Sequence, residues 1–371
     1  MFNFIHIVYL KFSHSTVSAN QSDLLNMIRA LHKTGQKIHF HCFYPVRVHL
    51  ESIEEYCEAI SLYAERIGVD NFTAGEIRKI LGTEKSRLVE NLKQDDYPII
   101  CHGYQACKII FESSDMKGRN VLFRLLRNEP QYLSDLAKVT PWGLRKLFYL
   151  ISCWQTAGVF KNLLGHKKIA FSNDSIKPSS KTLKIQEFRG SSETFFKEGF
   201  GSFCLYHGDL SKRENEFAAQ WLLEHVFNNL EIPFVIAGKD PSEQLEQAAH
   251  VRMHTCLVSN PGEMEMKELI KKAQIILLPT FIEEQSQDFA MHALLLGRHV
   301  LVNSRAAKMS PFESLFDIAE TPEEFRDKTE KLFSTLFVEE QKNKRLYEIS
   351  QIESDDFKAK AMINLLELPD Q

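Results

Sequence analysis

Apolar residues follow the chain in a strand–helix–strand rhythm from its beginning. The segment 3–10, NFIHIVYL, is rich in β-branched and aromatic side chains and predicts a strand. Residues 21–35 repeat apolar side chains at helical spacing and predict a helix that Ser22 or Asp23 can cap. The segment 37–43, KIHFHCF, predicts the next strand. A strand, a helix and a strand in this order form a βαβ unit, which implies a parallel sheet.

The rest of the chain repeats this alternation of apolar runs for strands and helical patterns between them. The strands predicted beyond residue 43 are 97–103, 120–126, 167–173, 202–208, 233–238, 251–258, 274–280 and 298–303. The helices predicted beyond residue 43 are 141–165, 214–230, 242–249, 263–273, 288–297 and 322–333. Strands that alternate with helices indicate an α/β protein with parallel sheets, and such sheets bind ligands at the carboxyl ends of their strands.

A change of composition divides the chain into two parts. Residues 176–201 belong to a stretch rich in Ser, Lys and Gly, which is typical of a linker. We therefore expect an N-terminal Rossmann-like domain over 1–175 and a C-terminal Rossmann-like domain over 202–345. The remaining stretch, 346–371, is charged and has a helical pattern.

Composition and charge narrow the classes of function without selecting one. The 371 residues, 44% hydrophobic and 25% charged, suit two packed globular domains, and the formal net charge of −4 gives no bulk basic field for nucleic acid. Seven widely spaced cysteines without a CxxC pair fit reduced thiols in a cytoplasmic protein. The first residues do not resemble a signal peptide, and the longest apolar runs, about ten residues, are too short to span a bilayer. Peripheral contact with the inner face of a membrane stays open.

Four segments of the second half follow one another in a specific order. They are LYHGDLSKREN (205–215), FVIAGKDP (234–241), NPGEMEMKELIKKAQIILLPT (260–280) and ALLLGRHVLVN (293–303). In this order they resemble the donor domain of GT-B glycosyltransferases, the large retaining group (glycosyl transferases group 1, family 4 type) that uses nucleotide sugars. The first half resembles the acceptor-side domain more loosely, through 5–43, 97–107 and 124–133.

This resemblance implies a fold and a reaction. The fold has two Rossmann-like parallel-sheet domains that face a deep interdomain cleft, and the helix 346–371 packs back on the N-terminal domain. The reaction moves a sugar from a nucleotide-sugar donor to a glycan or lipid-linked acceptor, in polysaccharide or glycoconjugate biosynthesis. Such folds stabilise the leaving diphosphate with cations and helix N-termini, so no metal and no further cofactor is expected.

The resemblance also assigns candidate site residues. The positions that match its donor site are Gly208, Lys212, Arg213, Gly238, Lys239, Thr280, Glu284 and His292. Ser18, Asn20 and Arg124 are acceptor-side candidates, although Arg124 can equally pair with Glu129. No catalytic residue is identified, and His102, which follows a predicted buried strand, is the candidate.

Two departures from the resemblance bear on activity. The loop over 11–22 contains no glycine, whereas a diphosphate held by backbone N–H groups needs a close backbone approach that glycine permits. Of the two glutamates that the resemblance places eight residues apart, the first matches Glu284 and the second position holds His292. We therefore expect a weakened or altered donor site.

Other readings of the same residues stay open. Lys212, Arg213 and Lys239 converge on a phosphate or are solvated loop cations, and Glu284 binds the donor or belongs to an exposed acidic loop. The whole chain is alternatively a non-catalytic GT-B scaffold that partners an active glycosyltransferase, or a sugar-nucleotide epimerase of the same architecture. His39 and His41 share one face of a strand, but the sequence suggests no third ligand, so no metal site is expected.

Overall fold

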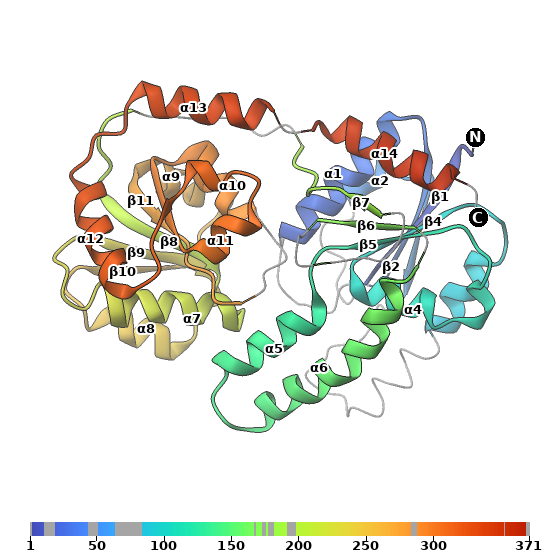
Figure 1. The fold of residues 1–371 in the computed structure, drawn as a ribbon, viewed down its shortest axis with the longest axis horizontal. Helices are drawn as coiled ribbons and strands as arrows, with labels where there is room; N and C mark the ends of the chain where they lie inside the picture. The colour runs from blue at the N-terminus through green and yellow to red at the C-terminus, as the bar shows by residue number, and fades with distance from the viewer. Residues whose placement is uncertain are drawn as a thin grey trace. The chain divides into compact units, whose positions relative to one another are not determined.

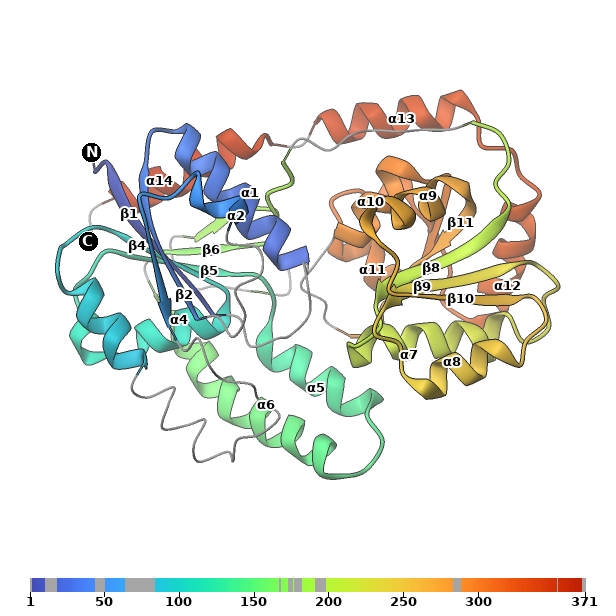
Figure 2. The ribbon, with the colours of Figure 1, turned by 180° about the vertical axis from the view of Figure 1, so that it is seen from behind.

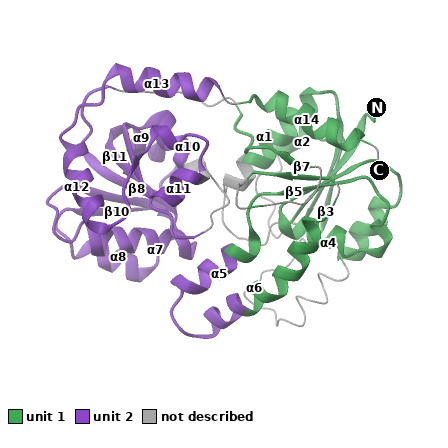
Figure 3. Ribbon diagram, in the orientation of Figure 1, with its two compact units in different colours: residues 1–131, 151–190, 353–371 green, residues 132–150, 191–352 purple. Residues whose placement is uncertain are grey.

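The structure is a computed structural model that forms two compact units (Figure 3). Unit 1 comprises residues 1–131, 151–190 and 353–371, and unit 2 comprises residues 132–150 and 191–352. The residues that the structure describes are 2–10, 19–43, 51–63, 84–166, 168–172, 176, 182–190, 198–282, 288–351 and 353–368. Each unit has its own sheet and its own hydrophobic core.

Unit 1 is built on a seven-stranded sheet in the order β3-β2-β1-β4-β5-β6-β7, in which all neighbouring strands are parallel (Figure 1). Its strands are β1 (Phe4–Leu10), β2 (Lys37–Phe43), β3 (Ala59–Tyr63), β4 (Ile99–His102), β5 (Val121–Leu125), β6 (Ile169–Phe171) and β7 (Thr182–Lys184). The chain adds β2 and β3 on one side of β1 and β4 to β7 on the other, so the direction of strand addition reverses between β1 and β4.

Helices cover both faces of this sheet, because the strands are buried on both sides. One core holds Ile5 and Ile7 of β1 against α1 (Ala19–Lys33) and α14 (Asp355–Glu367). The other core holds Val8 of β1 against the helix over 84–92, α4 (Tyr104–Phe111) and the end of α6 (Leu144–Leu163). Figures 1 and 2 both show α14 beside α1. The helices α2 (Glu51–Glu54), η2 (Ser114–Met116) and α5 (Glu129–Val139) complete the elements up to β6.

Buried polar groups fix α14 to the segment that follows β7. The Lys358 ammonium is almost fully buried and donates to the Glu187 carbonyl at 2.8 Å. The Asp355 carboxylate accepts hydrogen bonds from the backbone N–H groups of Arg189 at 3.0 Å and Gly190 at 2.7 Å. Such buried groups are stable only when they are paired, so these contacts specify where the C-terminal helix lies in unit 1.

Unit 2 is built on a six-stranded, all-parallel sheet in the order β10-β9-β8-β11-β12-β13. Its strands are β8 (Phe203–Asp209), β9 (Phe234–Lys239), β10 (Thr255–Ser259), β11 (Ala273–Leu277), β12 (His299–Val302) and β13 (Asp317–Ile318). Its helices are α7 (Arg213–Trp221), η3 (Leu222–Val226), α8 (Glu243–His250), α9 (Glu263–Lys272), α10 (Asp288–Leu296), α11 (Ser304–Met309), η4 (Glu313–Leu315), α12 (Pro322–Phe333) and α13 (Glu339–Ser350).

The sequence predicted this architecture, and the predicted α/β fold with two parallel sheets is confirmed. One local prediction was wrong: α1 begins at Ala19, so Ser22 and Asp23 lie inside the helix and do not cap it. The unit boundaries also differ from the expected ranges, since residues 132–150 belong to unit 2. Part of the expected linker belongs to unit 1, because β7 pairs with β6 and Phe188 is buried in the unit 1 core.

None of the helices in the described parts of the chain is both long enough and apolar enough to cross a membrane.

Candidate functional site

The carboxyl edge of the unit 2 sheet gathers most of the predicted donor-binding residues. Strand β8 lies between β9 and β11, so the direction of strand addition reverses at β8. In open α/β sheets, ligands bind outside the carboxyl ends of the strands at such a point. At this edge Gly208 pairs with Gly238, and Asp209 pairs with Lys239. The register of β8 and β9 therefore places three of the predicted residues side by side.

Gly208 and Gly238 are explained by close packing between these strand ends. A Cβ atom added to Gly238 would overlap the Gly208 carbonyl oxygen and press on Leu210. A Cβ atom on Gly208 would lie only 3.2 Å from the Asn215 side chain, which itself donates to the Asp209 carbonyl at 2.9 Å. Gly238 is thus required by the fold whether or not a ligand binds here, whereas a side chain at Gly208 would need Asn215 to shift by a few tenths of an ångström.

The three cations of this edge differ in how far they are already engaged. The Arg213 guanidinium donates to the Glu216 carboxylate at 2.9 Å and to the Val139 carbonyl at 3.2 Å, so its position is set by its own unit. The Lys239 ammonium lies 3.7 Å from the exposed Asp240 carboxylate. Among the residues that the structure describes, none forms an ion pair with Lys212, which precedes α7. Lys212 and Lys239 are therefore the cations that an anionic ligand can engage most readily.

Two residues with a left-handed backbone lie beside these cations. Asp240 has φ of 45° and Asn260 has φ of 55°, and in the described ranges they are the two non-glycine residues with positive φ. The Asn260 side chain accepts a hydrogen bond from the Asp240 N–H at 2.9 Å, and the Asn260 N–H donates to the Gly238 carbonyl at 2.8 Å. Such conformations cost free energy and cluster at ligand sites, so they support a functional role for this edge.

Thr280, the next predicted donor residue, is held rigidly by Asn303 at the end of β12. The Asn303 side chain accepts from the Thr280 N–H at 3.1 Å and donates to the Thr280 carbonyl at 2.8 Å. Arg305 donates to the Phe281 carbonyl at 2.8 Å and forms an ion pair with Asp135. Asn303 and Arg305 were not among the predicted site residues, although an asparagine directly after a predicted strand is a signal for a helix N-cap.

His292 and Glu284 lie on the segment after β11. Glu284 lies outside the described residues, so the predicted role of its carboxylate stays a prediction. His292 is on α10, with part of its surface exposed. The packing around its ring lowers the pKa of His292, Lys267 lowers it further, and Glu263 raises it.

His207 is a buried histidine on β8. Burial, followed by the charge of His292, lowers the pKa of His207 to about 3, so His207 is a neutral polar group.

In unit 1, the acceptor-side and catalytic candidates belong to a buried polar cluster. Arg124 of β5 forms a bidentate ion pair with Asp23 of α1, and it contacts His102 Nδ1 at 3.1 Å. The Asp23 carboxylate also accepts from the Phe188 N–H at 2.7 Å. Arg124 and His102 are each 1% exposed or less. The cluster therefore ties β4, β5, α1 and the segment after β7 together inside unit 1.

The charge states of this cluster follow from burial and from the ion pair. Burial acts to raise the pKa of Asp23, but the attraction and hydrogen bonds of Arg124 outweigh it and hold the pKa below its usual value. Burial lowers the pKa of His102 to about 3, and the Arg124 cation acts in the same direction. His102 is thus a neutral imidazole near pH 7, enclosed by protein groups.

Of the roles that the sequence left open for Arg124, the pairing with Glu129 is not formed. Arg124 binds Asp23, while Glu129 is bound by Arg127 through two hydrogen bonds of 2.8 and 3.1 Å. Glu129 is near in sequence, but Arg124 is on a buried strand that faces α1. The catalytic role of His102 stays a prediction, and a substrate can reach its ring only if the surrounding residues move.

The remaining candidates in the N-terminal half of the chain are Ser18, Asn20, His39 and His41. Ser18 lies outside the described residues, and Asn20 is the second residue of α1. The sequence suggested no third metal ligand beside His39 and His41, but the structure supplies one, because His6 of β1 pairs directly with His39 of β2. The register of two strands decides this pairing, and no local pattern reveals it.

Known proteins are similar to this chain in structure but not in sequence. No family model and no curated protein matches the sequence. Sucrose-phosphate synthase from Thermosynechococcus elongatus is similar over 98% of both chains, with a TM-score of 0.71 and 10% identity. The S. aureus protein TarM, solved in complex with Fondaparinux, alpha-GlcNAc-glycerol and UDP, is similar over 99% of this chain and 100% of its own, with a TM-score of 0.67 and 8% identity.

A third solved structure is HepE of Anabaena in complex with UDP and glucose. It is similar over 97% of this chain and 95% of its own, with a TM-score of 0.57 and 10% identity. At such low identity these likenesses establish the fold, and they do so over nearly the whole chain.

The buried ion pair of Asp23 and Arg124 should contribute to the free energy of unfolding. We expect Asp23→Asn to lower the free energy of unfolding by about 3–5 kcal/mol, because it leaves the Arg124 charge buried without a counter-ion. The loss is measured by urea unfolding at pH 7, with Asp96→Asn, on an exposed residue, as the matched control. Because the pKa of Asp23 is lowered in the folded state, the contribution is present above the unfolded value of about 3.9 and disappears as the pH falls through the folded value.

A double variant distinguishes the effect of losing the ion pair from the effect of losing packing. Asp23→Asn combined with Arg124→Met should cost less than the sum of the two single changes, because the unpaired buried charge is gone. A loss below about 1 kcal/mol for Asp23→Asn, or strict additivity in the double variant, would contradict this role.

Proposed function

We propose that this chain, which has the GT-B fold, is a glycosyltransferase that binds a nucleotide-sugar donor at the carboxyl edge of the unit 2 sheet. The acceptor that we propose is a glycan or a lipid-linked glycan. The observation that carries the proposal is the position of Lys212 and Lys239 in the chain, directly after β8 and at the end of β9, beside the left-handed residues Asp240 and Asn260. Solved structures of the same fold hold UDP, which makes UDP the first nucleotide to test.

The chemistry requires stabilisation of the diphosphate that leaves the sugar. Charge develops on the diphosphate oxygens as the bond to the anomeric carbon breaks, and cations placed there lower the barrier. Lys212 and Lys239 are the groups that we assign to this task, so that transfer itself needs no metal ion. We also propose that the configuration at the anomeric carbon is retained, which NMR of the first-formed product determines.

The surroundings of these cations support a modest affinity for the donor. Lys239 already faces Asp240, and Arg213 already faces Glu216, so a diphosphate must compete with protein carboxylates. The position where the resemblance expects a second glutamate holds His292, which cannot accept a hydrogen bond as a carboxylate does. Both features are consistent with the weakened or altered donor site that the sequence predicts.

A non-catalytic scaffold is the second candidate function. It is favoured by the cluster of His102, Arg124 and Asp23, in which Arg124 binds Asp23 and contacts His102 and all three side chains are buried inside unit 1. A scaffold of this fold would keep the two sheets while losing contacts to the donor. The two functions differ in whether the chain binds a nucleotide sugar and transfers its sugar. Binding and turnover assays measure these two steps directly.

We further propose that α6 brings the chain to the surface of a membrane, where a lipid-linked acceptor resides. Its first part exposes large apolar side chains at helical spacing: Leu144, Leu147, Phe148, Ile151 and Trp154. Trp142 precedes the helix with 85% of its surface exposed, and the Lys146 ammonium lies 5.0 Å from the centre of a Trp142 ring. An exposed apolar stripe with aromatic and basic residues is the pattern of an interfacial helix.

The donor site is tested by titrating UDP and a panel of nucleotide sugars into the protein by calorimetry. We expect saturable binding in the native chain and a loss of about ten- to a hundredfold in affinity for Lys239→Gln, since one charged contact is removed. Lys331→Gln, on exposed α12, is the matched control and should bind like the native chain. Binding followed by transfer to an acceptor supports the glycosyltransferase.

The same titration separates the alternatives. Tight native binding that collapses in His292→Glu would show that His292 belongs to a re-tuned site. Conversion of the nucleotide sugar without an acceptor would show an epimerase. An absence of both binding and turnover in the native chain would refute the enzyme and favour the scaffold.

Membrane contact is tested by co-sedimentation with vesicles that contain anionic lipid. We expect Leu144→Ser combined with Trp154→Ser to weaken partitioning at least about tenfold, because two large apolar side chains no longer enter the interface. Met253→Ser, at a residue that is 94% exposed elsewhere in unit 2, is the control and should leave partitioning unchanged. Equal partitioning of all three proteins would contradict the role of α6.

A further inference from the structure

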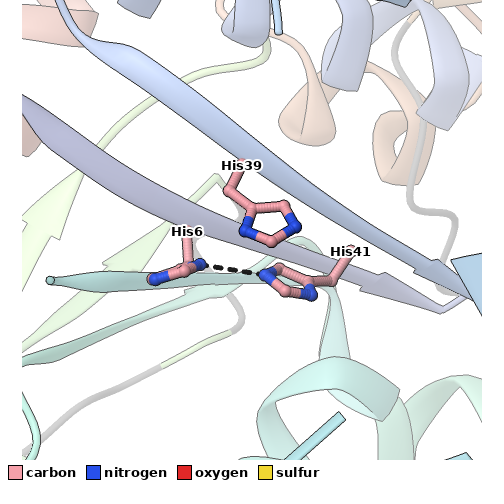
Figure 4. A group of neighbouring side chains, drawn as sticks. All are labelled: His6, His39 and His41. Atoms are coloured by element: carbon pink, nitrogen blue, oxygen red, sulfur yellow. Dashed lines mark hydrogen bonds between the residues drawn. The ribbon is translucent and has the colours of Figure 1, made fainter. Parts of the chain in front are cut away.

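We propose that His6, His39 and His41 form a binding site in unit 1 for one divalent transition-metal ion of the zinc type. Figure 4 shows the three imidazole rings grouped on neighbouring strands. One ring nitrogen from each histidine lies within 4.8 Å of the other two. This inference does not depend on the proposed sugar transfer, because it concerns a metal ion in unit 1, whereas the proposed donor site is in unit 2.

Strand register creates the cluster. His6 of β1 pairs directly with His39 of β2, and His41 follows two residues later on the same face of β2. The three side chains share the face that carries Val8 and Tyr63, which is covered by the helix over 84–92. His6 is near the amino end of β1, so the cluster lies away from the carboxyl edge where this kind of sheet binds substrates.

Each imidazole is oriented by a hydrogen bond from one of its ring nitrogens. His6 Nε2 lies 2.9 Å from the Asp95 carboxylate, His41 Nδ1 lies 2.8 Å from the Tyr63 hydroxyl, and His39 Nε2 lies 2.8 Å from the Ser61 hydroxyl. Metal-binding histidines characteristically use one nitrogen for the metal and give the other to a carboxylate, a hydroxyl or a carbonyl. The cluster therefore has the outer partners of a metal site as well as its ligands.

The protons can be assigned around the contact between His6 and His41, whose Nδ1 and Nε2 atoms are 2.9 Å apart. His6 Nε2 donates its proton to Asp95, which leaves a lone pair on His6 Nδ1 for a metal. His41 Nε2 donates to this lone pair in the metal-free protein. When a metal binds, that proton moves to His41 Nδ1, where the Tyr63 oxygen can accept it, so no net proton is released.

The geometry needs a small adjustment to accept an ion. Tetrahedral zinc with bonds of 2.0–2.1 Å separates its ligand nitrogens by roughly 3.4 Å. His6 and His41 must move apart by about half an ångström, and the nitrogen of His39 must approach. His39 is the one ring of the three that is partly exposed, so it provides the path of entry and leaves room for a water as the fourth ligand.

The ligand set selects the class of metal. Imidazole nitrogen suits Zn²⁺, Co²⁺, Ni²⁺ and Cu²⁺, whereas Mg²⁺ and Ca²⁺ prefer oxygen ligands. A bound ion would join β1 to β2 and would stabilise the folded state by mass action.

The test uses the full chain, stripped with a chelator and then loaded with Co²⁺ or Zn²⁺. We expect one equivalent of metal after gel filtration, visible Co²⁺ absorption bands of a four- or five-coordinate site, and a higher melting temperature with Zn²⁺. His39→Gln should fold without metal as the native chain does, since His39 is partly exposed, but should lose the bound metal and the Zn²⁺ shift. His32→Gln, on an exposed face of α1 in the same unit, should keep both.

A further variant addresses the outer partners. Asp95→Asn should keep the three ligands and weaken the affinity for Zn²⁺ about ten- to a hundredfold, because the carboxylate no longer orients His6. The proposal is overturned if the native chain retains no metal, or if His39→Gln retains as much as His32→Gln does. Either result would leave the three histidines as a polar cluster without a ligand, in which His6 and His41 share a hydrogen bond.

Discussion

Parallel pairing of the strands is the constraint on which the rest of this structure depends. In a parallel sheet all strands end at the same edge, so residues far apart in the sequence meet there according to the order and the register of the strands. In unit 2 this brings Asp209 beside Lys239 and creates the candidate donor edge. In unit 1 the same rule places His6 beside His39, near the opposite ends of the strands.

The two sheets also show how buried polar groups limit what each unit can do. Arg124 and His102 occupy strand ends in unit 1, where a substrate contact was expected, but their polar atoms face Asp23 and each other. In unit 2 the corresponding edge keeps cations that are only partly matched by carboxylates. We therefore place the proposed donor site in unit 2, and catalysis by His102 stays a prediction.

The strands and their alternation with helices could be predicted from the sequence, because these depend on local patterns. The donor-binding residues came from the family resemblance, and their role stays a prediction. Asp23 shows where local reasoning fails: a polar residue near a predicted helix start suggested a cap, but its partner is Arg124, 101 residues away. The pairing of Arg124 with Glu129, one of the alternatives that the sequence left open, is not formed for the same reason. His6 was missed as a neighbour of His39 because strand register decides which residues pair, and a single sequence does not reveal the register.

The central claim is that a nucleotide sugar binds at the carboxyl edge of the unit 2 sheet. Hydrogen exchange of backbone amides, measured with and without saturating UDP, tests it most directly because it locates the ligand independently of turnover. We expect slower exchange in 209–213, 239–242 and 303–306, where the strand ends and the following helices meet. Unchanged exchange in all three segments at saturating UDP, or protection confined to unit 1, would contradict the account.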